Sequence, residues 1–256
     1  MTHHTELLSS VYQLTDAMGV CMTLLVGTER ALLVDTGYGV EDLAASVASL
    51  TDRPLDVVLT HGHHDHALGA RWFPHVFLHP AEAAVYGVYT GEAWRRRVLD
   101  SALQKGLNPP ADFLTCPMPA PALLEGGVLP LGGMRAEVVP CPGHTPGSLA
   151  VYVPERQLLI TGDDWNPTTW LFFPEALDVF SFRRNLRKLL QLPFANVLCA
   201  HREGLFPRAA LEQFAAGLTD ERILAAPPCP VGEGYDIRTS RLVPCEGQEL
   251  IFRALI

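Results

Sequence analysis

The stretch that decides the fold is Val57-Val58-Leu59-Thr60-His61-Gly62-His63-His64-Asp65-His66. A short apolar run, typical of a buried strand, leads directly into four histidines and one aspartate within six positions. Solvated histidine tracts belong to chain ends or polar loops, whereas this one follows a predicted buried strand. The placement therefore predicts a metal site at the carboxyl end of that strand, with Gly62 as a spacer.

The spacing within this run separates two kinds of donor. Residues two apart in extended backbone point to the same side, so His61 and His63 can bind one cation. Asp65 and His66 follow where the chain must turn, so they can face a second cation. His64 points the opposite way by the same alternation, and we exclude it as a ligand. Imidazole and carboxylate donors suit zinc, and iron or manganese accept them too.

Three further segments place a possible ligand at the end of a strand or in a tight turn. They are Pro142-Gly143-His144-Thr145-Pro146-Gly147, Leu158-Leu159-Ile160-Thr161-Gly162-Asp163 and Val197-Leu198-Cys199-Ala200-His201. Taken alone, each histidine or aspartate could be an ordinary turn residue. Taken together and in this order, they predict ligands that converge on the first cluster. Asp164 is the alternative carboxylate beside Asp163.

The order of these motifs resembles that of the metallo-β-lactamase superfamily, whose pattern is His-x-His-x-Asp-His followed by a separate His, Asp and His. The resemblance covers roughly residues 11 to 215, and every motif position is filled. It implies an α/β fold, a four-layer αβ/βα sandwich of two mixed sheets with helices outside. It also implies that His61, His63 and His144 bind one metal. Asp65, His66 and His201 would bind the other, and Asp163 would bridge the two.

The resemblance also implies roles for two aspartates, Asp35 and Asp65, beyond the holding of metal. Asp35, in Leu33-Val34-Asp35-Thr36-Gly37, resembles an early aspartate of the family and is predicted to support a ligand histidine. Two cations about 3.5–4 Å apart can bridge a water and lower its pKa toward about 7, which yields a hydroxide nucleophile. Asp65 is the predicted catalytic residue, which orients this hydroxide and carries a proton to the leaving group.

The resemblance leaves the substrate open. The turn at 142–147 and the strand end at Asp163 look most like the glyoxalase II branch and its lactonase relatives. We therefore predict a metal-dependent hydrolase that uses a metal-bridging hydroxide to cleave an ester, thioester or lactone of a small molecule. The alternatives are a phosphodiesterase or nuclease, an iron-dependent sulfur dioxygenase and a non-catalytic metal-binding module. Asn166 departs from the lactonase branch, which often has a tyrosine at that position.

Two regions without predicted ligands are candidates for substrate contact. Residues 80–107 have helical patterning and, with the Pro- and Gly-rich stretch that follows, predict a helical lid insertion around 80–127. Arg95, Arg96 and Arg97 could attract an anionic substrate there, with a solvated helix face as the alternative. The stretch 165–173 is rich in aromatic residues, and an apolar pocket wall is predicted from Trp165, Trp170 and Phe172, with ordinary core packing as the alternative.

The remaining pattern predicts two sheets with helices packed outside them. Strands are predicted at 11–15, 21–28, 31–36, 56–60, 76–78, 134–139, 148–153, 157–161, 196–200 and 249–255. Helices are predicted at 41–50, 80–107, 174–192 and 207–224. Since predicted ligands lie on both sides of the Pro-rich stretch at 108–127, we expect one domain over residues 1–256.

The amino-acid composition and net charge limit the classes of molecule that this protein is expected to bind. The 256 residues are 48% hydrophobic and 18% charged, which is typical of a globular protein, and the net charge of −9 disfavours nucleic acid or an anionic membrane as a partner. We find no apolar run near the roughly 20 residues that span a bilayer and no signal-peptide pattern at the start. The expected setting is cytoplasmic, with a small-molecule substrate. The oligomeric state stays open.

The dispersed cysteines and terminal histidines have ordinary interpretations. The six cysteines contain no Cys-x-x-Cys pair, and a disulfide framework is not expected in a chain of this size. Cys21 and Cys199 lie in apolar runs and are predicted to be small buried hydrophobic residues. His3 and His4 are interpreted as solvated terminal residues.

Overall fold

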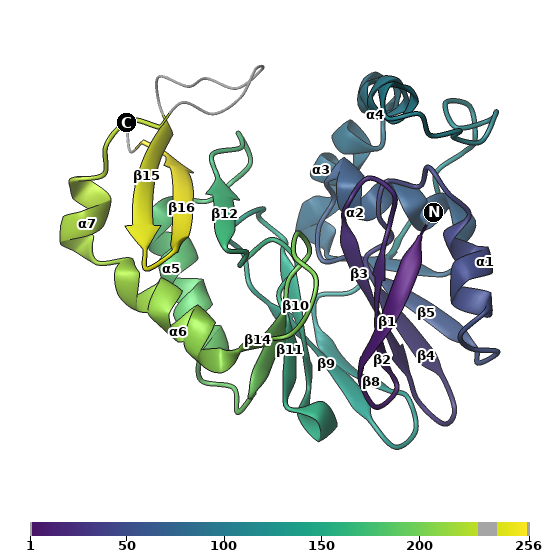
Figure 1. Cartoon of the computed structure of the whole chain (residues 1–256), viewed down its shortest axis with the longest axis horizontal. Coiled ribbons are helices and arrows are strands. Elements are labelled where there is room, and N and C mark those ends of the chain that lie inside the picture. The colour runs from purple at the N-terminus through teal and green to yellow at the C-terminus, as the bar shows by residue number, and fades with distance from the viewer. Residues whose placement is uncertain (1, 230–239, 255–256) are drawn as a thin grey trace.

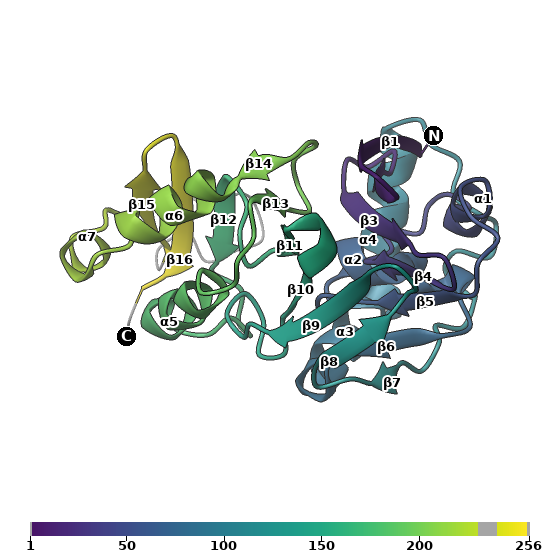
Figure 2. The same cartoon turned by 90° about the horizontal axis from the view of Figure 1, so that it is seen from below.

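The computed structural model describes residues 2–229 and 240–254. Two sheets face each other, and helices cover the outer face of each (Figures 1 and 2). The first sheet and its helices form the half drawn in purple and blue, and the second sheet leads into the green and yellow half. This arrangement confirms the predicted four-layer αβ/βα sandwich.

The first sheet contains seven strands in sequence order. They are β1 (His3–Leu8), β2 (Val11–Thr15), β3 (Cys21–Val26), β4 (Ala31–Val34), β5 (Leu55–Val58), β6 (Val76–Leu78) and β7 (Ala122–Leu123). The pairings from β1 to β4 are antiparallel, and those from β4 to β7 are parallel. Because parallel strands end at a common edge, the residues that follow β4 and β5 lie side by side.

The second sheet contains six strands in the order β14 (Phe206–Pro207), β13 (Asn196–Leu198), β11 (Leu158–Ile160), β10 (Leu149–Val153), β9 (Arg135–Pro140) and β8 (Gly127–Pro130). Strands β11 and β13 are parallel, so their carboxyl ends share one edge. The antiparallel strands β9 and β10 are joined by the turn that contains His144. The second sheet therefore presents three predicted ligand positions.

Alternation along the strands builds the layers. In β4, Leu32 and Val34 pack between the two sheets, whereas Ala31 and Leu33 pack outward. The outward residues contact α1 (Leu43–Ala48) and the segment that follows α2 (His64–Ala67). On the second sheet, α5 (Val179–Leu189) and α6 (Arg208–Gly217) cover the outer face. The central strands of the two sheets, such as β4 and β10, are thus buried on two faces, as their continuous apolar sequences require.

A third, three-stranded sheet was not predicted. It pairs β12 (Thr168–Leu171) with β16 (Gln248–Arg253) in parallel, and β16 with β15 (Ser240–Cys245) in an antiparallel register. The predicted strand at 249–255 is confirmed as β16, and residue 255 lies outside the described residues. The predicted helix at 207–224 is divided, because Thr219 caps a separate helix, α7 (Asp220–Leu224).

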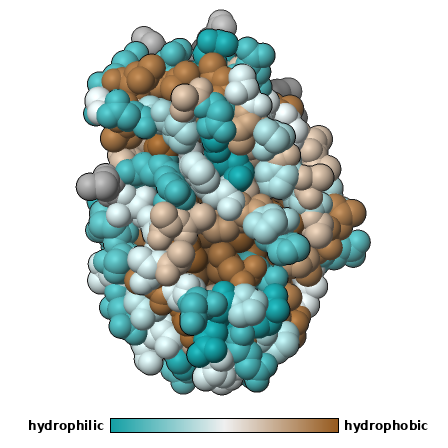
Figure 3. Space-filling view, turned by 90° about the vertical axis from the view of Figure 1, so that its right-hand side faces the viewer, coloured by the Kyte–Doolittle hydropathy of each residue, from teal (hydrophilic) through white to brown (hydrophobic). Residues whose placement is uncertain are grey.

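The predicted helical stretch at 80–107 is present as a short 3-10 turn at Pro80–Glu82 followed by α3 (Ala83–Tyr89) and α4 (Glu92–Gln104). Its lid role stays a prediction. The stretch 108–127 is not entirely loop, because β7 extends the first sheet beside β6. In Figure 3, which faces this side of the molecule, hydrophobic residues gather both near the top and in the middle of the face, with hydrophilic residues between them.

The three arginines of α4 do not form the free cationic face considered from the sequence. Arg95 is buried and donates to the carbonyl of Phe113. Arg96 pairs with Glu92 one helical turn away, and the guanidinium of Arg97 lies 4.8 Å from the ring centre of Trp94. Arg95 is therefore a structural residue.

The exposure of individual side chains tests the predictions for two cysteines and for the two histidines near the N-terminus. Cys21 and Cys199 are buried thiols, as predicted. His3 and His4 are exposed but belong to the edge strand β1, where His3 lies 2.7 Å from a carboxylate oxygen of Glu203. No helix within residues 2–229 and 240–254 is long and apolar enough to cross a membrane.

The prediction that Trp165 lines the substrate pocket is wrong. Its side chain is fully buried in the core between the second sheet and the outer helices. The indole Nε1 donates to Gln248 Oε1 at 2.9 Å, and the ring packs edge-on against Phe206. Trp165 thus ties the third sheet to the sandwich.

We expect Trp165→Ala to lower the free energy of unfolding by about 3–5 kcal/mol, because it removes a large buried side chain and leaves a cavity. Trp170→Ala is the matched control, since that side chain is 48% exposed, and its cost should stay within about 1 kcal/mol. Urea unfolding followed by circular dichroism measures both. Equal losses would contradict the assignment of Trp165 to the core.

Candidate metal centre

All the predicted ligand residues converge where the two sheets meet at their carboxyl edges. His61, His63 and His144 form one group of potential ligands. A second group contains Asp65, His66, Asp163 and His201. Within each group the donor atoms lie within 4.8 Å of one another. Each group draws residues from both sheets, so the fold itself assembles the two clusters.

Asp163 joins the two groups. Its Oδ2 lies 3.6 Å from Nε2 of His144, in the first group. Its Oδ1 lies 3.1 Å from Nε2 of His201 and 3.5 Å from Nε2 of His66, in the second. Its Oδ2 also lies 3.2 Å from Nε2 of His201. The carboxylate therefore stands between the two groups and within reach of both, which is the position that a bridging ligand requires.

Unsatisfied polar atoms indicate that the groups fit cations. Nε2 of His61 and Nε2 of His66 are buried and have no hydrogen-bond partner among the described residues. Buried polar atoms are nearly always hydrogen-bonded in folded proteins, so two orphaned imidazole nitrogens in adjoining groups need another partner. Divalent metals that prefer nitrogen and carboxylate oxygen suit this set of ligands.

Asp35 holds two of these histidines, as predicted for one of them. Its Oδ2 accepts a hydrogen bond from Nδ1 of His66 at 2.9 Å. The Thr60 hydroxyl donates to the same carboxylate at 2.8 Å and lies 3.0 Å from Nδ1 of His61. Asp35 adopts a φ of 65°, a conformation that is costly for a residue with a side chain. This buried carboxylate thus fixes one imidazole directly and another through Thr60.

His63 and His144, the other two ligand candidates of the first group, are held by contacts that the sequence did not indicate. Nε2 of His63 donates to Oε1 of Glu175 at 2.6 Å, which leaves Nδ1 facing His144 at 3.0 Å. Nδ1 of His144 donates to the backbone carbonyl of Trp170 at 2.6 Å. Such partners fix ring orientation and tautomer in metal sites.

Glu82 is a further residue that the sequence analysis missed. It is fully buried, and its carboxylate accepts hydrogen bonds from the backbone N–H groups of Gly62 at 2.8 Å and Gly147 at 2.7 Å. It therefore clamps the two loops that carry His63 and His144. Gly62 is more than a spacer, because a Cβ there would lie 2.6 Å from the backbone nitrogen of Tyr86.

His64 lies outside both groups, as predicted, but for a different reason. Helix α2 begins at this residue, so strand alternation no longer applies. The imidazole stacks on Trp94 at a centroid distance of 4.6 Å and lies nearly parallel to Tyr89. It packs against α3 and α4 instead of facing a metal.

The electrostatic environment sets the protonation states of the site. Burial alone would raise the pKa of Asp65, but the neighbouring His66, His64 and His201 outweigh it and lower that pKa to about 2. Burial, together with nearby His63, lowers the pKa of His144 to about 4. At neutral pH the carboxylate is ionised and the imidazole is neutral, which are the forms that bind metals.

Asp164 differs sharply from its neighbour Asp163. Burial raises the pKa of Asp164 well above its usual range, whereas His201 and His66 overcome burial and hold the pKa of Asp163 well below. Oδ1 of Asp164 accepts a hydrogen bond from the backbone N–H of His144 at 3.2 Å. The structure therefore places Asp163, and not Asp164, among the candidate ligands, while Asp164 supports the turn around His144.

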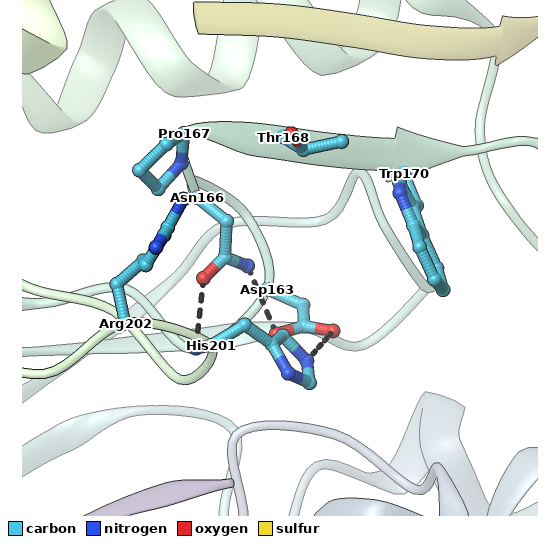
Figure 4. A pocket seen from close by; sticks show the side chains of 7 residues that line it. All are labelled: Asp163, Asn166, Pro167, Thr168, Trp170, His201 and Arg202. Carbon is cyan, nitrogen blue, oxygen red and sulfur yellow. Dashed lines mark hydrogen bonds and ion pairs between the residues drawn. The ribbon is translucent and has the colours of Figure 1, made fainter. Parts of the chain in front are cut away.

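A pocket of about 270 Å³ opens beside the second group (Figure 4). It is lined by Asp163, Asn166, Pro167, Thr168, Trp170, His201 and Arg202. Asn166 connects two of these residues, because its Nδ2 donates to Asp163 Oδ1 at 3.1 Å and its Oδ1 accepts from the His201 backbone at 3.0 Å. Asn166 and Arg202 were not predicted from the sequence.

The predicted aromatic wall is only partly present. Trp170 lines the pocket as predicted. Phe172 is buried and packs against Trp170 and Phe173, so it supports the wall without lining it. His79 does not line this pocket, because its Nδ1 accepts a hydrogen bond from Ala81 at the start of the following helical turn.

We expect Asp35→Asn to weaken metal binding roughly 10- to 100-fold, because the amide can no longer accept hydrogen bonds from both His66 and Thr60 at the same strength. Competition with a chromogenic chelator measures the affinity. Asp56→Asn is the control, because Asp56 lies near the start of β5, away from the ligands, and pairs with Arg30. This variant should leave the metal affinity unchanged. Similar affinities for the two variants would show that Asp35 does not support the ligands.

Comparisons with known proteins agree with this geometry. The family model of the Metallo-beta-lactamase superfamily matches residues 16–201. An acyl-coenzyme A thioesterase, MBLAC2 of Gallus gallus, is 31% identical over 186 residues, which cover 65% of this chain and 66% of that protein. The hydroxyacylglutathione hydrolase GloC of Haemophilus influenzae is 29% identical over 56% of this chain and 65% of its own length.

A solved structure is similar as well. TTHA1623 in a di-iron-bound form is 26% identical, covers 76% of this chain and 92% of its own, and superimposes with a TM-score of 0.56. The chain spans slightly less than two thirds of the length of the curated relatives named above. The region that the family model matches, residues 16–201, contains every candidate ligand.

Proposed function

Because the chain belongs to the metallo-β-lactamase superfamily, we propose that it is a binuclear metal-dependent hydrolase of small-molecule thioesters. The observation that carries the proposal is the pair of donor groups joined by the two oxygens of Asp163. The choice of thioesters is supported by the relatives, since an acyl-coenzyme A thioesterase and a hydroxyacylglutathione hydrolase both act on acyl thioesters by name.

The ligand residues would be divided between two divalent cations. His61, His63 and His144 would hold one, and the second group would hold the other with Asp163 shared. When bound, the cations would supply a water of lowered pKa and positive charge opposite the developing oxyanion. We propose zinc as the native metal. Iron is the alternative that the same donors accept, and it occupies the similar TTHA1623 structure.

Asp65 is the proposed general base. Its Oδ2 lies 3.6 Å from Nε2 of His201, and its low pKa keeps the carboxylate ionised at neutral pH. The carboxylate can therefore accept a proton from the attacking water and pass it to the sulfur that leaves when the carbon–sulfur bond breaks. Asn166 holds Asp163 in place, and Trp170 offers an apolar surface to the acyl group.

Removing the metals should abolish hydrolysis. We expect about two equivalents of metal in the active protein and no turnover after dialysis against a chelator, with recovery on adding zinc. Thioester, lactone and bis-phosphodiester reporters assayed side by side should show preference for the thioester. Full activity in metal-free protein would refute the proposed mechanism, and preference for a phosphodiester would refute the proposed substrate.

Asp65→Asn should lower kcat by roughly 100- to 10,000-fold, because the amide cannot accept the proton of the water. The fold should persist, and circular dichroism checks it. Asp112→Asn removes an exposed carboxylate that pairs with Arg71 and serves as the control. If the two variants hydrolyse thioesters equally fast, Asp65 is not the base.

A further inference from the structure

Arg202 stands out among the residues that line the pocket beside the second group. Several other arginines of the chain pair with a carboxylate, as Arg30 does with Asp56 and Arg208 with Glu212. The side chain of Arg202 is exposed and has no hydrogen bond or ion pair with any residue in the described parts of the chain. A cation is therefore held in the pocket without a partner among residues 2–229 and 240–254.

The backbone of Arg202 is firmly anchored although its charged group is not. The Arg202 carbonyl accepts a hydrogen bond from Nε2 of Gln13 at 3.3 Å, and Gly204 N–H donates to Oε1 of the same side chain at 2.7 Å. Gln13 is buried in β2, and the backbone N–H of Cys21, at the start of β3, donates a hydrogen bond to the carbonyl of Ala200 at 2.8 Å. The first sheet thus fixes the turn that carries the guanidinium.

The carboxylates of the site do not satisfy this cation. The oxygens of Asp163 face His201, His66, His144 and Asn166. Asp65 faces His64, His66 and His201. None of these contacts involves Arg202, so its positive charge remains available to a molecule in the pocket.

The opposite side of the pocket is apolar. Figure 4 shows Trp170 across the opening from Arg202, with Asp163 and His201 between them. Trp170 is 48% exposed, which leaves a large aromatic surface facing solvent. One wall therefore suits an acyl group and the other suits an anion, on either side of the reacting position.

We propose that Arg202 binds an anionic group on the thiol portion of the substrate, which deepens and rests on the proposed thioester hydrolase function. The natural substrates are then thioesters of thiols that carry phosphate or carboxylate groups. Guanidinium groups bind both anions through paired hydrogen bonds. In a chain of net charge −9, whose two donor groups contain the carboxylates of Asp65 and Asp163, a local cation also offsets repulsion of an anionic substrate.

The test compares one acyl group on three thiols: coenzyme A, which carries phosphates, glutathione, which carries carboxylates, and neutral N-acetylcysteamine. For each anionic thioester, the readout is its kcat/KM divided by that of the neutral one. In Arg202→Ala this ratio should fall roughly 10- to 100-fold, the loss expected for a charge-assisted contact. Arg202→Lys should recover part of it. The thiol with the larger loss identifies phosphate or carboxylate as the natural anion.

Arg187→Ala is the matched control, because it removes an equal charge from the exposed surface of α5 away from the pocket. It should leave the ratio unchanged, whereas an equal fall would assign the effect to overall charge and overturn the proposal. An unchanged ratio in Arg202→Ala would also overturn it. An equal loss on all three thioesters is one form of that outcome, and it marks a residue that supports the site without selecting the substrate.

A binding measurement separates this proposal from the proposed function. Calorimetry on metal-loaded protein uses the S-methyl ethers of the same three thiols, which cannot be hydrolysed. Arg202→Ala should weaken binding of an anionic ether roughly 10- to 100-fold relative to the wild type. If the wild type binds an anionic ether through Arg202 but hydrolyses no thioester, the proposed function fails and the binding role stands. If no anionic ether binds more tightly than the neutral one, the role of Arg202 is refuted.

Discussion

The site depends above all on one buried carboxylate at the end of β4. Asp35 accepts hydrogen bonds from the Thr60 backbone and hydroxyl and from the imidazole of His66, so it fixes the chain as it leaves β5 and orients a ligand at the same time. A buried carboxylate is stable only when its oxygens are satisfied. The strained backbone at this position is thus retained because three polar groups need that carboxylate there.

Around this centre, two other acidic residues brace the remaining loops. Glu82 joins the loops of Gly62 and Gly147, and Glu175 orients His63. Both come from segments that contribute no candidate ligand. The helical segment after β6 therefore has a structural role at the site whatever its motion, because it supplies the acceptor that holds two ligand loops together.

Local rules were sufficient to locate the candidate ligands, whereas the four-layer sandwich and the division of the ligands between two metals were predicted from the resemblance to the superfamily. Apolar strands that end on histidine or aspartate must place those residues at a sheet edge. The roles of Glu82, Glu175 and Asn166 depend on contacts between segments far apart in the chain, which no local pattern encodes. Trp165 and Trp170 were equivalent in an aromatic-rich stretch, and the contacts of Trp165 with the distant Phe206 and Gln248 distinguish the buried ring from the exposed one.

The division of each donor group between the two sheets has a mechanical consequence. His61 and His63 extend from the first sheet and His144 from the second, and the other group is split in the same way. A cation in either group would link the two sheets and oppose any sliding of one sheet over the other. Since ligands that bind only the native state stabilise it, the supply of metal would govern how long this protein survives as well as how fast it works.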